Sequence, residues 1–179
     1  AFTSGIVSAN SNVVLSLVSD LPEAIREQAL EQDLLEIKPA VKGNYTWVNS
    51  RTLEFVPEEA LKSGTIYQCR FQLGKLVEVP AGLEVLEFQF QTIQQSLFVE
   101  FMGLSSLDEE NLQWQQLKGM LRTADYADVD LVEQILEGSQ DGKALRVSWI
   151  HNSEENEHEF TVDSISRTEE KGQVLMKWD

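Results

Sequence analysis

Short segments that alternate apolar and polar residues, separated by turn residues, constrain this chain more than any other feature. In the first half these segments span residues 13–18, 34–37, 45–48, 52–56, 66–73 and 86–92. Asn, Gly, Ser and Pro gather between them, at residues 10–12, 42–44, 49–50, 63–64 and 80–82. Short strands at near-regular spacing are typical of sandwiches and barrels. The pattern therefore predicts an all-β fold.

One segment of the first half has a helical pattern instead. In residues 21–30, Pro22 suits a first helical position after Asp20. The apolar residues that share one side of this helix are Ala24, Ile25, Ala29 and Leu30. We expect a short helix that packs across one end of the sandwich.

The residues that lead into the strand at 66–73 predict a tyrosine corner. Leu61 and Gly64 come before Tyr67, which enters the strand. In a tyrosine corner the buried ring orders the loop, and its hydroxyl bonds to the backbone upstream. This favours an Ig-like or fibronectin-like Greek key. Residues 1–46 contain no Cys to pair across the sheets, so we expect packing alone to hold the core.

The single cysteine, Cys69, lies inside the same alternating strand. One cysteine excludes an intrachain disulfide framework and any site made of several cysteines. Alternation places Cys69 on the same face as Tyr67, Phe71 and Leu73. We predict a buried, inert thiol, because a nucleophilic thiol needs an exposed and electropositive setting.

The second half repeats the strand pattern after a polar link at residues 93–96. Strands are expected at residues 97–104, 112–126 with a bulge at 116–119, 144–150, 159–165 and 173–178. An acidic loop at residues 108–110 separates the first two of these strands. A short helix is expected at residues 129–136, with Asp128 as N-cap and Gly138 ending it. A length of 179 residues fits two small domains, with a boundary at about residue 95.

A longer pattern resembles a known family. It consists of the run from Trp47 to Pro57, then Leu61, Gly64 and Tyr67, then residues 88–92. Together they resemble the bacterial Ig-like domain of surface-layer proteins. They are most similar to the version at the N-terminal end of bacterial alpha-2-macroglobulin-like proteins. The match covers residues 5–93, and it implies fold more strongly than function.

The resemblance implies two consecutive Ig-like (macroglobulin-like) β-sandwich domains, residues 1–95 and 96–179, each with a short helix, in a fragment of a longer chain. Proteins of this family are large periplasmic or cell-surface chains, secreted or lipid-anchored, that are thought to trap proteases. Their thioester uses Cys-x-Glu-Gln, whereas Cys69 is followed by Arg70, Phe71 and Gln72. The implied role is a non-catalytic scaffold without a cofactor. Its implied partners are the remaining macroglobulin domains and, through the parent protein, proteases.

Charge narrows the range of partners further. The chain has 14 Lys and Arg against 30 Asp and Glu, for a net charge of -16. Such an acidic surface repels phosphate backbones and anionic lipids, which disfavours nucleic acid and membrane surfaces as partners. The sequence contains no apolar run approaching the ~18 residues of a membrane-spanning helix, so we expect no membrane insertion by this segment.

Two clusters are candidates for metal binding. His151 and His158 flank Glu154, Glu155 and Glu157, and a hairpin can bring two imidazoles and a carboxylate to one zinc ion. The alternative, which we favour, is a solvated hairpin tip, because the two histidines lack a close fixed spacing. The second cluster consists of Asp125, Asp128 and Asp130. It lacks the spacing and the final Glu of a calcium loop, so we favour acidic loop decoration.

Catalytic residues are not nominated by any local motif, and we expect no enzymatic activity. The paired acids Glu58–Glu59 and Glu169–Glu170 fall at predicted turns, where a solvated charge is the ordinary explanation. Trp114, Trp149 and Trp178 lie in predicted strands and are expected in the core rather than at a sugar site. Two alternatives to the scaffold role stay open. One is a surface module for adhesion or for binding carbohydrate or protein, and the other is a hydrolase with scattered carboxylates.

Overall fold

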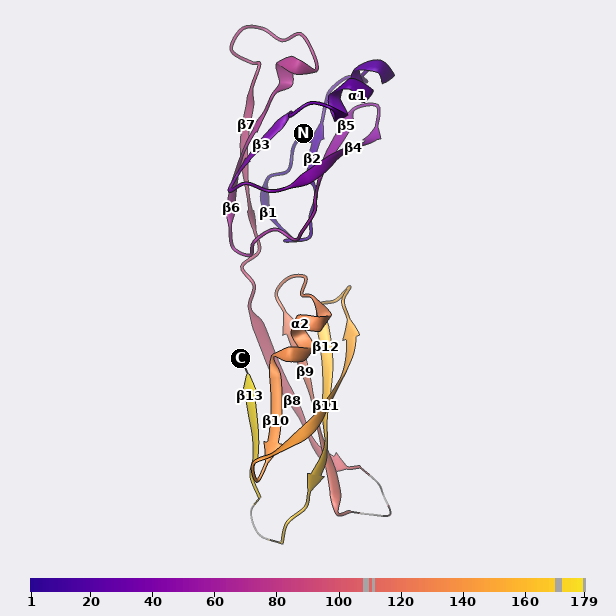
Figure 1. Ribbon diagram of the computed structural model, residues 1–179, viewed down its shortest axis with the longest axis vertical. Coiled ribbons are helices and arrows are strands. Elements are labelled where there is room, and N and C mark those ends of the chain that lie inside the picture. The colour runs from indigo at the N-terminus through magenta and orange to yellow at the C-terminus, as the bar shows by residue number, and fades with distance from the viewer. Residues whose placement is uncertain (108–109, 111, 170–171, 179) are drawn as a thin grey trace. The chain divides into compact units, whose positions relative to one another are not determined.

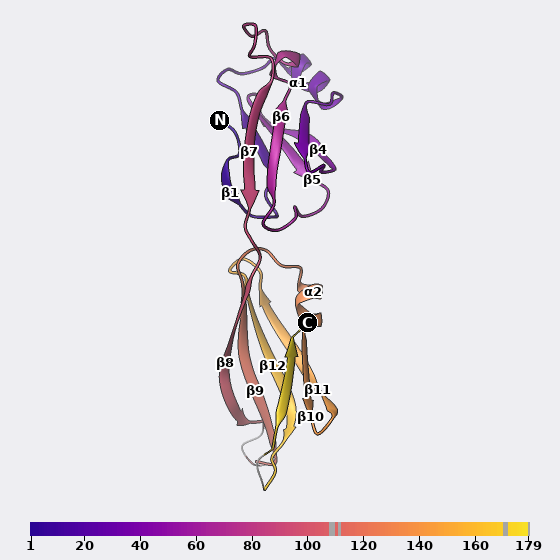
Figure 2. The same ribbon diagram turned by 90° about the vertical axis from the view of Figure 1, so that its left-hand side faces the viewer.

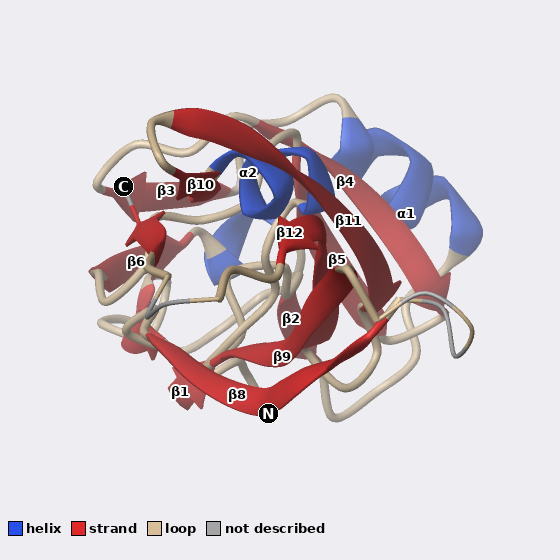
Figure 3. Cartoon of the chain, turned by 90° about the horizontal axis from the view of Figure 1, so that it is seen from below, coloured by secondary structure: helices blue, strands red, loops and turns tan. Residues whose placement is uncertain are grey.

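The computed structural model describes residues 1–107, 110, 112–169 and 172–178. The chain divides into two compact units, Ala1–Gln94 (unit 1) and Gln95–Asp179 (unit 2). Strands dominate the described residues of both units, and each unit has one short α-helix among them. Figure 3 shows the strands in red and the helices in blue. The all-β prediction is therefore confirmed.

Unit 1 contains two sheets (Figure 1). The four-stranded sheet has the order β1 (Gly5–Val7), β7 (Leu86–Thr92), β6 (Ile66–Phe71), β3 (Leu35–Lys38). The three-stranded sheet has the order β2 (Val13–Ser16), β5 (Thr52–Pro57), β4 (Gly43–Asn49). All neighbours are antiparallel except β1, which runs parallel to β7. Just before β1, Phe2 bridges to Leu15 of β2, so the first residues contact both sheets.

The core of unit 1 follows from the alternation of its strands. Tyr67, Cys69 and Phe71 of β6 are all buried, as the sequence predicts. They pack in one apolar cluster with residues of the other sheet, among them Leu53 and Phe55. The strand ends at Phe71, earlier than predicted, because the chain turns into the 3₁₀-helix η1 (Leu73–Lys75). Leu73 nevertheless packs against the same cluster.

The predicted helix of unit 1 is present as α1 (Glu23–Leu30). Pro22 is the N-cap residue, one position before the predicted one. Ala29 is buried, whereas Ala24 and Leu30 are exposed, so the buried side of the helix is narrower than the sequence pattern indicates. The indole Nε1 of Trp47 in β4 donates a hydrogen bond to the carbonyl of Arg26 at 3.0 Å, which fastens α1 to the smaller sheet.

The tyrosine corner is confirmed. Tyr67 is only 2% exposed, and its hydroxyl accepts a hydrogen bond from the backbone N–H of Lys62 at 2.9 Å. The ring stacks on Phe90 of β7 with centroids 5.3 Å apart. The side chain therefore holds the loop before β6 against the core.

Replacing Tyr67 with Phe is expected to lower the free energy of unfolding of unit 1 by about 1–3 kcal/mol, because the partly buried N–H of Lys62 loses its acceptor. Urea unfolding followed by circular dichroism measures the change. Tyr126→Phe, at an exposed tyrosine, is the control and should stay within about 0.5 kcal/mol of the unchanged chain. Equal stabilities for the two variants would show that this hydrogen bond does not hold the loop.

Unit 2 is built from six antiparallel strands in one continuous hydrogen-bonded order (Figure 2). The order is β13 (Val174–Trp178), β10 (Leu136–Gln140), β11 (Lys143–Asn152), β12 (Glu157–Ser166), β9 (Trp114–Thr123), β8 (Leu97–Ser106). The start of β11 pairs with β10 and the rest of it pairs with β12. The rings of Phe160 in β12 and Trp178 in β13 meet edge to face at 5.7 Å, so the sheet curls around its own core. The predicted second domain is thus all-β, but its strands are not divided into two separate sheets.

The bulge predicted at residues 116–119 is wrong. The register shifts lie in the two neighbours of β9, between Phe101 and Gly103 of β8 and between Val162 and Ile165 of β12. Gly103 and Ser164 have positive φ angles of 113° and 61° at these shifts, a conformation that suits a bulged residue. The extra residues are therefore in β8 and β12.

The second predicted helix is present as α2 (Val129–Gln134). Asp128 is its N-cap as predicted, and its carboxylate accepts a hydrogen bond from the N–H of Asp130 at 2.9 Å. The prediction that Gly138 ends this helix is wrong. The helix ends four residues earlier, and Gly138 lies inside β10, where it pairs with Leu145 and Met176. Residues around Gly138 form a strand rather than a helix because β10 pairs with β11 on one side and with β13 on the other.

Candidate functional site

The thiol of Cys69 is buried, as predicted, with 1% of the residue exposed. Burial raises the pKa of this thiol to about 11. The neutral thiol therefore prevails at physiological pH, which removes the nucleophilic thiolate form. Its place in the middle of β6, between β3 and β7, also keeps it from approaching a substrate.

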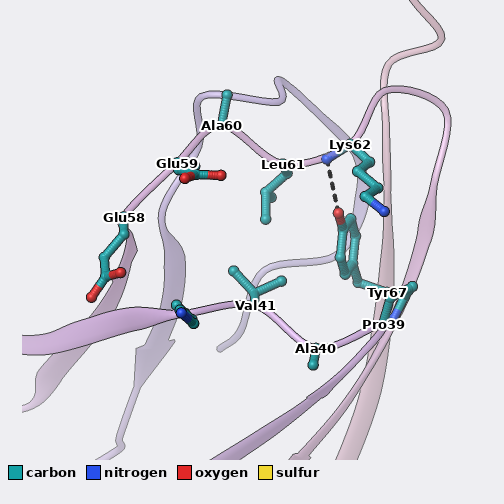
Figure 4. Close-up of a pocket in the computed structure, with 10 residues that line it drawn as sticks. Pro39, Ala40, Val41, Glu58, Glu59, Ala60, Leu61, Lys62 and Tyr67 are labelled. Carbon is teal, nitrogen blue, oxygen red and sulfur yellow. Dashed lines mark hydrogen bonds between the residues drawn. The ribbon is translucent and has the colours of Figure 1, made fainter.

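A pocket of about 310 Å³ lies beside the tyrosine corner (Figure 4). Two loops, residues 39–42 and 58–62, form it together with Tyr67. The Tyr67 hydroxyl already accepts the hydrogen bond from Lys62, and Glu58 lies on the far side of the pocket from it. Glu58 and Glu59 are exposed, as their predicted place at a turn implies. The pocket does not bring a nucleophile and a base together, and the Tyr67 hydroxyl is engaged by the corner.

The two histidines lie directly opposite each other on β11 and β12. Their Nδ1 atoms are 2.9 Å apart, and His158 is 1% exposed. The expectation of a solvated hairpin tip is therefore wrong for both rings, since His151 is half-buried as well. The hairpin extends beyond them, and its turn occupies residues 153–156.

The carboxylate beside this pair is Glu133, from α2. Its Oε1 lies 3.2 Å from Nε2 of His151. Glu155 instead accepts a hydrogen bond from Asn152, and Glu157 pairs with Arg122 at 2.7 Å. Sequence spacing does not single out Glu133, because it lies on another element, 18 positions from His151.

The geometry of the histidine pair does not favour the zinc alternative. Glu133 approaches Nε2 of His151, while His158 contacts its Nδ1 on the other side of the ring. The three groups therefore do not converge on one point. Within residues 1–107, 110, 112–169 and 172–178, no three His, Cys, Asp or Glu side chains are arranged to hold a metal ion.

The three aspartates proposed as loop decoration have different roles. Asp128 caps α2, and Asp130 lies in the first turn of that helix. Asp125 is only 4% exposed, which contradicts a purely solvated role for it. Its backbone N–H donates to the side chain of Gln95, and its carbonyl accepts from the hydroxyl of Thr123 at 2.8 Å. The cluster thus ends β9 and begins α2.

Two of the three tryptophans expected in the core are found there. Trp149 and Trp178 pack against the core of unit 2, as predicted. Trp114 is 42% exposed, so the prediction of a core position is wrong for it. Glu169 is exposed. Its neighbour Glu170, and Asp108 and Glu109 of the predicted acidic loop, lie outside the described residues.

Strand β8 of unit 2 exposes several large apolar side chains. We define the β8 surface as the exposed apolar residues of β8 and the residue after it: Leu97, Phe98, Phe101, Met102, Leu104 and Leu107, which are 47–61% exposed. Among the described strands, β8 has one hydrogen-bonded neighbour, β9. Phe101 touches the core through an edge-on contact with Phe160, at 6.0 Å between centroids. The alternation of residues 97–104 predicts a strand, but it does not reveal that the strand lies at an edge of the sheet.

The helices among the described residues are too short and polar to cross a membrane. No known family model matches the chain, and a comparison with curated proteins finds no similar sequence.

Solved structures with some similarity include L,D-transpeptidases. One is L,D-transpeptidase 3 from Mycobacterium tuberculosis with a faropenem-derived adduct, at 15% identity and a TM-score of 0.40, over 64% of this chain and 40% of that one. An L,D-transpeptidase from Mycobacterium smegmatis has 12% sequence identity and a TM-score of 0.38, over 97% of this chain and 68% of that one. A third L,D-transpeptidase, in complex with imipenem, has 12% sequence identity and a TM-score of 0.37, over 98% of this chain and 71% of that one. The chain thus spans less than half the length of the first, and similarity at this level does not establish a shared activity.

Proposed function

We propose that this chain is a non-catalytic scaffold and interaction module of an extracytoplasmic alpha-2-macroglobulin-like protein that traps proteases. Unit 1 would be an Ig-like sandwich and unit 2 a macroglobulin-like domain. The parent protein would be periplasmic or on the cell surface. Its protease-binding chemistry would lie in other domains, because Cys69 is buried and lacks the thioester motif.

The strand order of unit 1 carries this proposal. In Ig-like sandwiches three strands equivalent to β3, β6 and β7 face a sheet equivalent to β2, β5 and β4, and a tyrosine corner precedes the strand equivalent to β6. The first segment bridges to β2 and then pairs parallel with β7, which places it at the edge of both sheets. The run from Trp47 to Pro57, which resembles the family, forms β5 and the end of β4 in this arrangement.

The β8 surface supports the role of an interaction module. Exposed apolar patches on soluble domains commonly mark contacts with other proteins. A long exposed edge strand also presents unpaired backbone groups that favour contact with another polypeptide. The occupant that we propose is a neighbouring domain of the same parent chain.

An adhesion or protein-binding module is the second candidate, because Phe98, Phe101 and Trp114 are exposed aromatic residues. Phe98 and Phe101 are three positions apart on one strand, so their rings leave opposite faces of the sheet. That arrangement favours a protein partner over a flat sugar platform.

The test of the proposed function uses the full-length parent protein. Adding a protease is expected to produce a compacted, protease-bound form with altered gel mobility and reduced activity on a large protein substrate. This chain alone should neither trap nor inhibit the protease. A parent protein that ignores proteases, while this chain binds a separate protein or glycan, would favour the second candidate.

A double substitution tests the β8 surface. We expect Phe98→Ser with Met102→Ser to weaken binding of this chain to the remaining domains of the parent by about tenfold or more, equivalent to ~1.4 kcal/mol, because both apolar side chains are lost. Calorimetric titration of the two purified parts measures the affinity. Ile150→Ser, at an apolar residue of β11 that is 72% exposed, is the control and should leave binding unchanged. Equal binding by all three chains would contradict the proposed interface.

A further inference from the structure

The His151–His158 pair links three elements of unit 2. His151 lies on β11 and His158 on β12, and α2 supplies Glu133. The imidazole rings meet edge to face with centroids 5.1 Å apart. Glu133 binds the outer nitrogen of His151, and His158 contacts the inner one. The chain of contacts therefore runs from α2 into the buried face of the sheet.

The Nδ1 contact sets a limit on the number of protons that the pair can hold. A hydrogen bond between two Nδ1 atoms needs one proton between them, with one ring donating and the other accepting. When the pair carries one extra proton, His151 is the better site for it, because Glu133 faces its Nε2. When both rings are cationic, two N–H groups face each other at 2.9 Å and neither can accept.

His158 is poorly placed to carry a charge. It is 1% exposed, and its Nε2 is buried without a hydrogen-bond partner among the described residues. Burial lowers the pKa of His158, and the charge of His151 lowers it further. The group opposite it on β9 is Leu121. Alternation turns its neighbours Glu157 and Glu159 to the other face of β12.

The helix α2 is short, and few of its side chains contact the rest of unit 2. The helix has six residues, of which Val132 alone is buried. Its Glu133 is the side chain that reaches the histidine pair. The Glu133–His151 contact is therefore one of the side-chain contacts that attach α2, beside the burial of Val132.

We propose that Glu133, His151 and His158 form an acid-sensitive latch that holds α2 against the sheet of unit 2. The latch is closed while the pair carries no more than one extra proton. Protonation of His158 opens it, because the two cations repel and the buried ring is not solvated. The latch concerns unit 2 alone and does not depend on the proposed scaffold role.

The direction of the pH dependence follows from the proton balance. An unfolded histidine has a pKa of about 6.5, and the pKa of His158 in the folded chain is lower. Between these two values the unfolded chain binds more protons than the folded one, so stability falls as the pH falls. The contribution of the latch is complete above about pH 6.5 and is lost as the pH decreases through the folded value.

The test compares the full chain with its His158→Leu variant between pH 7.5 and pH 4.5. Between about pH 6.5 and the folded pKa of His158, uptake of one proton lowers the folding equilibrium constant of unit 2 by up to about tenfold for each unit that the pH falls. The His158→Leu variant should lack this part of the pH dependence. Urea unfolding at each pH measures it. His158→Gln is the second variant and should resemble His158→Leu, because neither side chain titrates.

A nitrogen-15 NMR titration of the unchanged chain makes the test independent of whether the variants fold. The His158 ring is expected to titrate below the value of about 6.5 for an unfolded histidine, and amide exchange protection in α2 should fall together with the His158 titration. Titration of His158 near pH 6.5 with unchanged protection of α2 would overturn the latch. So would a zinc-induced rise in melting temperature at pH 7.5 that disappears in His158→Leu, because the pair would then be a metal site.

Discussion

Replacing Phe160 with Ala is expected to lower the free energy of unfolding of unit 2 by about 3–5 kcal/mol. Phe160 is fully buried and contacts the rings of Phe101, Trp149 and Trp178. The core cluster of unit 2 has only four buried apolar residues among those described: Leu136, Phe160, Val162 and Ile165. Removing the largest of them leaves a cavity that the curled sheet cannot fill.

Urea unfolding monitored by NMR separates the two units, because their amide signals can be followed independently. The signals of unit 2 should disappear at lower urea in the variant, and those of unit 1 should keep their midpoint. Phe98→Ala removes an aromatic ring that is 61% exposed in the same unit, and it is expected to change stability by less than about 0.5 kcal/mol. Similar losses for Phe160→Ala and Phe98→Ala would show that Phe160 is not central to the core.

Replacing Gly119 with Val is expected to cost unit 2 about 3 kcal/mol, at the upper end of the range for overpacking. Gly119 is in β9, between Phe101 on β8 and Phe160 on β12. A Cβ atom at this position would overlap the Phe160 ring and would lie 2.8 Å from the carbonyl oxygen of Glu100. The aromatic ring takes the space that a side chain would need.

A double-mutant cycle isolates this cause. In a chain that already carries Phe160→Ala, the same Gly119→Val substitution should cost much less, because the ring that it meets is absent. Thermal and urea unfolding of the four chains give the coupling free energy, which we expect to be about 1 kcal/mol or more for residues in contact. Strictly additive losses would place the strain at the backbone of Glu100 rather than at the ring.

Several local features could be predicted because nearby residues decide them. The side chains of a strand alternate between faces, so Tyr67, Cys69 and Phe71 were expected on one buried face and are found there. Asp128 caps α2 through a contact with a residue two positions away. The tyrosine corner spans five positions, from Lys62 to Tyr67. Each depends on contacts within a few residues, which a single segment can encode.

Other features were predicted wrongly or not at all because they depend on the place of a segment in the sheet. The alternation of β8 is that of a half-buried strand, yet β8 is at an edge and several of its apolar residues are exposed. Gly119 resembles a bulge residue in sequence, but the ring of Phe160 is what excludes a side chain there. Gly138 resembles the end of a helix, but the pairing of β10 with β13 extends it as strand.

The candidate latch also combines features set by nearby residues with features set by tertiary packing. The sequence by itself determined a hairpin with two histidines near its turn, but it placed both histidines in the turn, outside the predicted strands at residues 144–150 and 159–165. Only the tertiary structure decided that His158 is buried, that the two Nδ1 atoms meet, and that Glu133 approaches from a helix earlier in the chain. Burial and such contacts arise when segments distant in sequence pack together, and the pattern within any one segment does not contain them.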